Sequence, residues 1–205
     1  AKDFDDALSF KKLKNNNVEI GIHIADVTHY LEKDTLLDKE AKKRATSVYL
    51  SDRVVPMLPE ILSNDLCSLN PNEDKNVFSV LVEIDNNFNI ISKEFSKCLI
   101  NSNERMSYQE AQHVIENKNE KLPAEVTINK KKRSLSKELV EAILHLNSVA
   151  LKLKEKRKNE GSVFFNKEEV RFVVNDKGEP TDYKIKKQKQ ANFLIEEFML
   201  LANVL

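Results

Sequence analysis

The chain has 205 residues, enough to bury one compact core, and 32% of them are charged. Its 33 basic and 33 acidic side chains cancel, so the summed field of the chain does not attract a polyanion, and any contact with nucleic acid has to be local. No run approaches the roughly 18 consecutive apolar residues of a membrane span, and the chain opens with charge, so we expect a soluble, cytoplasmic protein.

An acidic segment comes first along the chain and is followed by a strand pattern. Three aspartates fall within residues 3–6, directly before an alternating run that starts near Leu8. Residues 18–24 alternate between apolar and other side chains, which is typical of a strand with one buried face. A helix is expected over 36–46, and the prolines that follow predict an ordered loop with short turns over 49–71.

The middle of the chain predicts a hairpin, a short helix and an exposed connection. Residues 77–100 are rich in β-branched and aromatic side chains on both sides of a polar turn. Ser107 and Glu110 have the spacing of a capping box, which predicts a helix that ends near residue 116. The polar run over 117–133 is the best candidate for a mobile loop.

The last third predicts two helices separated by a hairpin. Apolar residues at three- and four-residue steps over 139–153 indicate an amphipathic helix, the longest in the chain, with Gly161 at its C-terminal cap. Strands are expected at 170–174 and 182–186, and a largely apolar, buried helix from about Gln190 to the end. We therefore predict an α+β fold with a mixed-sheet or barrel-like β core packed with helices.

The acidic segment is the strongest chemical signal. Like charges as close as those of Asp3, Asp5 and Asp6 raise one another's pKa, whereas a hard divalent cation stabilises all of them in the ionised form. Two magnesium ions could hold the attacking water and the leaving oxygen of a phosphodiester. The segment therefore favours metal-assisted hydrolysis. An arbitrary cluster of this kind is more often a solvated acidic loop or a helix cap.

Two other motifs share this pattern. A calcium-binding EF-hand is excluded because Leu8 stands where the loop needs Gly, and Lys14 where it needs Glu. Phosphatases of the haloacid dehalogenase type use an aspartate nucleophile in a DxDx[TV] motif. Residues 3–7 match this motif except at Ala7. That enzyme class stays open as an alternative.

Five sequence blocks span nearly the whole chain. They are AKDFDDA at 1–7, IADVTHYL at 24–31, TSVYLSDRVVPMLP at 46–59, LCSLNP at 66–71 and LIEEFMLLAN at 194–203. In order and spacing these blocks resemble the ribonuclease II/ribonuclease R family, and the LCSLNP form is closer to ribonuclease R.

The resemblance implies the N-terminal part of a catalytic RNB domain over residues 1–205, truncated at both ends. It implies a processive 3′→5′ exoribonuclease that degrades single-stranded RNA to nucleoside 5′-monophosphates with Mg²⁺, or with Mn²⁺. By the motif, Asp3, Asp5 and Asp6 match the last three members of a fourfold aspartate cluster. The first member would lie six residues upstream, so we expect this fragment alone to be inactive. Oligonucleotide-binding domains flank the catalytic domain in the family.

The resemblance also implies RNA contacts. Tyr49 matches the tyrosine that stacks near the scissile end, although a core position is the commoner fate of such a tyrosine. Phe164 matches a second stacking aromatic, so Phe165 should face the opposite way. Tyr108 matches an aromatic at the outer end of the RNA path, and Glu196 matches a glutamate that contacts ribose. A catalytically inactive RNA-binding relative stays open as a third function class.

Overall fold

The core of the protein is an open antiparallel sheet. In the computed structural model, which describes residues 3–50, 53–164, 169–175 and 179–205, the sheet has the order β1-β2-β5-β6. Its strands are β1 (Asp6–Lys12), β2 (Val18–Ala25), β5 (Asp74–Ile84) and β6 (Ile90–Asn101). Each predicted strand is thus present, and each pairs with its neighbour in the antiparallel sense.

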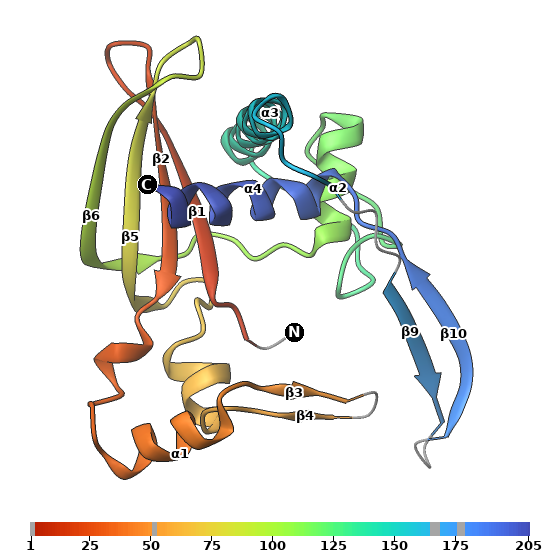
Figure 1. Cartoon of the computed structure of the whole chain (residues 1–205). Helices are drawn as coiled ribbons and strands as arrows, with labels where there is room; N and C mark the ends of the chain where they lie inside the picture. Colours follow the sequence, from red (N-terminus) through yellow and green to blue (C-terminus); the bar gives the residue numbers. More distant parts are fainter. Residues whose placement is uncertain (1–2, 51–52, 165–168, 176–178) are drawn as a thin grey trace.

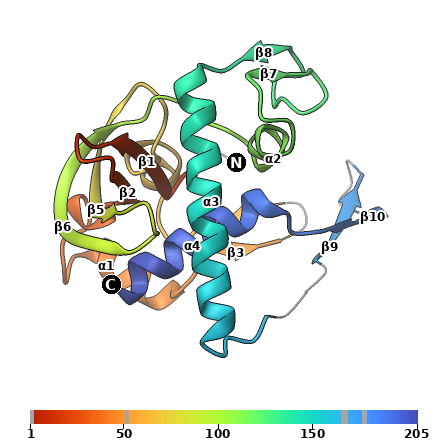
Figure 2. The ribbon, with the colours of Figure 1, turned by 90° about the horizontal axis from the view of Figure 1, so that it is seen from above.

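Three helices lie on one face of this sheet, two of them against its strands and the third against those two helices (Figures 1 and 2). They are α2 (Tyr108–Asn117), α3 (Lys137–Asn159) and α4 (Gln190–Val204), and Figure 2 shows α3 lying across α4. Alternate residues of β2 and β5 point at the helices, among them Ile20, Ile22 and Val82, which are fully buried. Phe198 of α4 packs into the same cluster. The predicted capping box is present at Ser107 and Glu110.

The opposite face of the sheet carries a polar chain around His23. Its Nδ1 lies 2.7 Å from Ser79 Oγ and its Nε2 lies 2.9 Å from Ser9 Oγ. The ring crosses Gly21, where a Cβ would overlap both the Ser9 hydroxyl and the imidazole. Glycine therefore allows a nearly buried histidine to lie flat on this face.

Below the sheet a smaller unit is built from α1 (Leu36–Arg44), the hairpin of β3 (Val48–Tyr49) and β4 (Val54–Val55), and the π-helical turn η2 (Leu62–Leu66) (Figure 1). It follows a 3-10 turn, η1 (Val27–His29). Leu62 and Leu69 pack with Val77 in a second buried cluster. The predicted loop over 49–71 is thus partly regular.

Two further hairpins complete the chain. The strands β9 (Glu169–Val174) and β10 (Pro180–Lys186) form the predicted C-terminal hairpin. The connection over 117–133, predicted as a mobile loop, contains β7 (Lys121–Leu122) paired with β8 (Arg133–Ser134). Thr127 organises it, because its buried hydroxyl contacts the carbonyl oxygens of Ala124 and Lys131 and the Lys131 amide.

The structure confirms the α+β class. Within the described residues no helix is both long and apolar enough to cross a membrane. The β3–β4 and β9–β10 hairpins project on the side of the sheet where β1 begins, as Figures 1 and 2 show. The acidic segment therefore lies at the place where the sheet, the lower unit and the helices meet.

Candidate functional site

The acidic segment is fixed by its backbone. The Phe4 amide donates to Ser68 Oγ at 3.1 Å, and the Phe4 carbonyl accepts from the Leu69 amide at 2.9 Å. The Asp5 carbonyl accepts from the Ala25 amide at the end of β2. The first and fourth resemblance blocks thus meet in space. These hydrogen bonds fix the backbone that carries the carboxylates at the start of β1.

The carboxylates of the segment repel one another. Burial, and then the neighbouring charge of Asp5, raise the pKa of Asp3 to about 6. The same two causes, in the same order, raise the pKa of Asp6. Asp3 Oδ1 is buried, and no described residue offers it a hydrogen bond. The segment therefore holds negative charge that the described residues do not neutralise.

Nearby charged groups are compensated. Asp26, at the end of β2, accepts from the Thr28 hydroxyl and forms an ion pair with Lys97 at 3.0 Å, and these contacts lower its pKa. Lys75 is bound by Glu73 at 2.8 Å and by the Asp65 carbonyl at 2.6 Å. The uncompensated charge is thus concentrated on Asp3, Asp5 and Asp6.

The donor set fits a divalent cation in part. Asp3 and Asp5 lie within hydrogen-bonding reach of each other, and the orphaned Asp3 oxygen is the kind of acceptor that magnesium takes as a ligand. In the part of the chain that the structure describes, however, no three His, Cys, Asp or Glu side chains are close enough to form a metal site. Asp3 and Asp5 would therefore hold such an ion together with oxygens from elsewhere.

The two tyrosines singled out by the sequence are accessible. Tyr49 is 73% exposed on the β3–β4 hairpin, so it is no part of the core. Tyr108, at the start of α2, is half exposed. Burial, and then the charge of Asp6, raise the pKa of Tyr108, which places its ring near the acidic segment.

Phe164 follows the end of α3 and is 38% exposed. The Arg157 guanidinium lies 5.2 Å, and the Lys154 ammonium 5.5 Å, from the centre of its ring. Phe165 lies outside the described residues, so the predicted opposite orientation stays a prediction.

The two acids of the LIEE block behave differently. Glu196 is exposed, whereas the Glu197 side chain is only 1% exposed and binds Arg157 Nη2 at 2.9 Å. Sequence reasoning overlooked Glu197, although it lies three residues after Leu194 and beside Phe198, on the buried stripe of α4. Glu196 is thus free to meet a ligand, and Glu197 holds α3 against α4.

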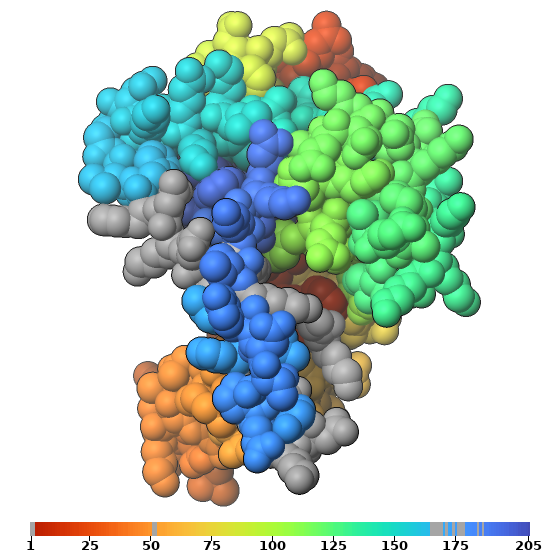
Figure 3. Space-filling view, turned by 90° about the vertical axis from the view of Figure 1, so that its right-hand side faces the viewer, coloured from red at the N-terminus to blue at the C-terminus, as the bar shows by residue number. Residues whose placement is uncertain are grey.

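Arg105 connects the acidic segment to α2. Its guanidinium lies 5.0 Å from the centre of the Phe4 ring. In the space-filling view, red atoms from the start of the chain are visible in a hollow beside the green surface around α2 (Figure 3). Part of the N-terminal stretch is therefore exposed on this side.

Comparison with known proteins agrees with this geometry, because the RNB domain matches residues 1–205. The chain belongs to the RNB domain family. It is 43% identical over 204 residues to a DIS3-like exonuclease 2 of Schizosaccharomyces pombe, covering 99% of this chain and 22% of that protein. It is 40% identical over 203 residues to ribonuclease R 1 of Lactococcus lactis, covering 99% of this chain and 24% of that protein.

A solved structure of Mycoplasma genitalium RNase R in complex with ribose-methylated single-stranded RNA matches with a TM-score of 0.85 at 28% identity. The match covers 99% of this chain and 30% of that one, so the chain spans less than a third of each of these relatives. The resemblance to the ribonuclease II/ribonuclease R family is confirmed, and with it the RNB-type fold. The family that matches the whole chain is the RNB domain and not a haloacid dehalogenase-type phosphatase.

Proposed function

We propose that this RNB domain belongs to a magnesium-dependent exoribonuclease that removes nucleotides processively from the 3′ end of single-stranded RNA. The observation that carries the proposal is the uncompensated charge of Asp3, Asp5 and Asp6, with one buried carboxylate oxygen left without a partner. Relatives at 40% identity or more named as an exonuclease and as ribonuclease R support it.

The chain's own residues would hold and orient the reacting groups. Asp3 and Asp5 would hold Mg²⁺, or Mn²⁺, and Asp6 would add negative charge at the same strand entrance. The ion supplies positive charge that stabilises the attacking and leaving oxygens of the phosphodiester. Backbone bonds from Phe4 to Ser68 and Leu69 keep the carboxylates in place. The products would be nucleoside 5′-monophosphates.

The RNA would be held by stacking and by ribose contacts. Tyr49 and Phe164 would stack on terminal bases, which suits an enzyme that accepts every nucleotide. Tyr108 would contact the strand farther out, and exposed Glu196 would bind a 2′-hydroxyl, which distinguishes RNA from DNA. A related RNase R solved with single-stranded RNA supports RNA binding by this domain.

The relatives are much longer than this chain, so the remaining RNA-binding surface is proposed to lie in flanking oligonucleotide-binding domains. That arrangement fits the zero net charge, because the phosphate-binding surface would be largely elsewhere. We place the protein in the cytoplasm, and nearer to the ribonuclease R branch on the LCSLNP block.

The test is Asp5→Asn in the intact protein. Asn keeps the size and one acceptor oxygen but removes the charge that holds the ion, so release of nucleotides from a 3′-labelled strand should stop. RNA affinity in chelator should persist, because stacking and backbone contacts remain. Asp34→Asn, at an exposed position outside the cluster, is the matched control.

Undiminished degradation by Asp5→Asn would overturn the role of the cluster. A folded, unmodified protein that binds RNA but never cleaves it with Mg²⁺ or Mn²⁺ would favour the inactive relative instead. The first outcome is seen in the Asp5→Asn variant, and the second is seen in the unmodified protein, so the two can be told apart.

A further inference from the structure

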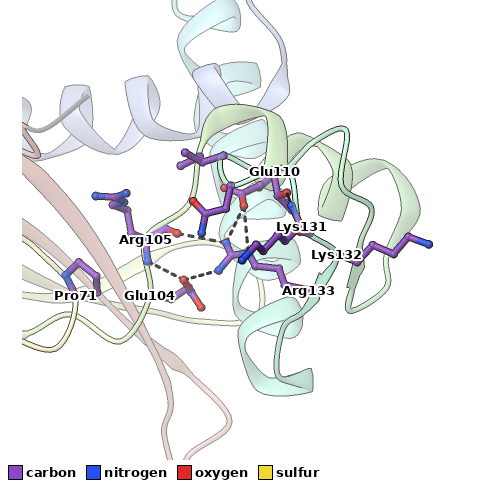
Figure 4. A pocket seen from close by; sticks show the side chains of 10 residues that line it. Pro71, Glu104, Arg105, Glu110, Lys131, Lys132 and Arg133 are labelled. Atoms are coloured by element: carbon purple, nitrogen blue, oxygen red, sulfur yellow. Dashed lines mark hydrogen bonds and ion pairs between the residues drawn. The ribbon is translucent and has the colours of Figure 1, made fainter.

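A cavity of about 540 Å³ lies beside the start of α2. Four cationic and two anionic side chains line it, and they come from two segments of the chain, 104–110 and 131–133 (Figure 4). The cations are Arg105, Lys131, Lys132 and Arg133, and the anions are Glu104 and Glu110. The cavity therefore carries a net positive charge within a chain whose net charge is zero.

The floor of the cavity is built around Arg133. Its Nη1 donates to Glu104 Oε1 at 2.8 Å, and its Nε and Nη2 reach Glu110 Oε1 at 3.1 and 3.0 Å. Glu110 is buried and also closes the capping box of α2 by accepting from the Ser107 amide. One arginine thus neutralises much of both acids and fixes β8 to the start of α2 (Figure 4).

The remaining cations are free to bind an anion. Among the described residues no acid forms an ion pair with Arg105, Lys131 or Lys132. The hydrogen bonds of Thr127 hold the backbone at Lys131, so this cation is presented by an ordered turn. In Figure 4, Lys131 lies beside Arg133, and Lys132 extends outward.

The cavity adjoins the acidic segment. Arg105 lines the cavity, and its guanidinium lies over the ring of Phe4. Phe4 stands between Asp3 and Asp5 in the sequence. Tyr108, whose pKa is raised in part by Asp6, starts the helix that Glu110 caps. The cavity is thus close enough to the acidic segment for one extended polyanion to reach both.

We propose that this cavity binds a phosphate of the RNA backbone while the strand extends past Tyr108 to the acidic segment. The inference rests on the proposed function and deepens it by assigning Lys131 and Arg105 to phosphate binding. A lysine and an arginine supply positive charge and hydrogen-bond donors to the oxygens of a phosphodiester. Such contacts do not depend on the base sequence of the RNA.

The test is RNA binding by Lys131→Ala in the intact protein, measured in chelator over a series of salt concentrations. Loss of one phosphate contact should weaken binding about three- to tenfold and reduce the slope of log affinity against log salt by about 0.7. Lys131→Arg keeps the charge and should keep the slope. Lys121→Ala removes an exposed lysine of the same connection outside the cavity and should change neither.

Single neutral methylphosphonate linkages, moved stepwise along the RNA, locate the phosphate. One linkage should weaken binding by the unmodified protein and have no further effect on Lys131→Ala. RNA binding with an unchanged slope, or with additive effects at every linkage, would overturn the inference and leave the proposed function standing. A protein that does not bind RNA at any salt concentration would overturn both.

Discussion

At the residue scale, the partners of a carboxylate decide what it can do. Asp26 is buried at the end of β2 and Asp3 is partly buried nearby. The Thr28 hydroxyl and Lys97 lower the pKa of Asp26, whereas burial and Asp5 raise the pKa of Asp3 to about 6. Asp26 is thus a satisfied structural group. Asp3 remains a candidate ligand for a cation.

Tyr49→Ala tests the stacking assignment. Because the ring is exposed, its loss should not disturb the fold. Losing one stacked base should weaken binding of the RNA 3′ end by about 1–3 kcal/mol and change the length of the final product, while cleavage continues. Product lengths resolved on a gel provide the readout, and Tyr49→Phe, which keeps the ring, is the control. Complete loss of cleavage in a folded variant would instead make Tyr49 part of the chemistry.

His23 makes stability depend on pH. Burial lowers its pKa, so the fold favours the neutral ring. The resulting stability is present above the unfolded value of about 6.5 and is lost as pH falls through the lower folded value. The free energy of unfolding should therefore decrease between pH 7.5 and 5, and decrease less in His23→Gln. Urea unfolding of both proteins across this range measures the difference, and identical pH slopes would contradict the assignment.

At the scale of elements, single polar contacts fix how helices and loops are joined. Arg157 and Glu197 connect α3 to α4 from within the helix layer, where the Glu197 side chain is almost fully buried. Thr127 and Arg133 do the same for the connection over 117–133. Each contact joins segments whose own sequences would permit several arrangements.

Arg157→Met should destabilise the protein by about 3–5 kcal/mol, because it leaves the buried Glu197 carboxylate without its charged partner. Replacing both residues, as Arg157→Met with Glu197→Leu, should recover most of that loss. Lys156→Met, at an exposed position 3.9 Å from Glu160, should cost less than about 1 kcal/mol. Chemical denaturation gives the three values, and equal losses in the single and double variants would contradict the ion-pair explanation.

At the scale of the whole molecule, the chain matches less than a third of the length of each relative compared. Exposed Tyr49, Val54 and Val55 give the β3–β4 hairpin an apolar surface, and Phe78 and Phe95 do the same for the sheet. The acidic segment is likewise incomplete as a metal site within the described residues. A completed site needs further oxygen ligands.

The 205-residue chain should therefore bind Mg²⁺ or Mn²⁺ weakly and should not degrade RNA by itself. Magnesium needs several oxygen ligands, and Asp3 and Asp5 supply only part of a shell that substrate phosphate would help to complete. Isothermal titration with either metal measures the affinity, with Asp3→Asn as the control. A micromolar dissociation constant for the unmodified chain would contradict this expectation.

The sequence by itself determined the elements and the acidic segment, because these depend on residues close together in the chain. The alternation over 18–24, the Ser107–Glu110 capping box and the long amphipathic helix were each predictable from local spacing. Only the tertiary structure brought Ser68 and Leu69 to Phe4, and Lys97 to Asp26.

Tertiary structure also decided which residues face outward. It buried Glu197 rather than Glu196, exposed Tyr49 despite its apolar neighbours, and ordered the connection over 117–133 through Thr127 and Arg133. These outcomes depend on contacts between residues far apart in the chain. Local propensity carries no information about such contacts, so the free charge of the candidate site became visible only after the sheet, the helices and the hairpins were assembled.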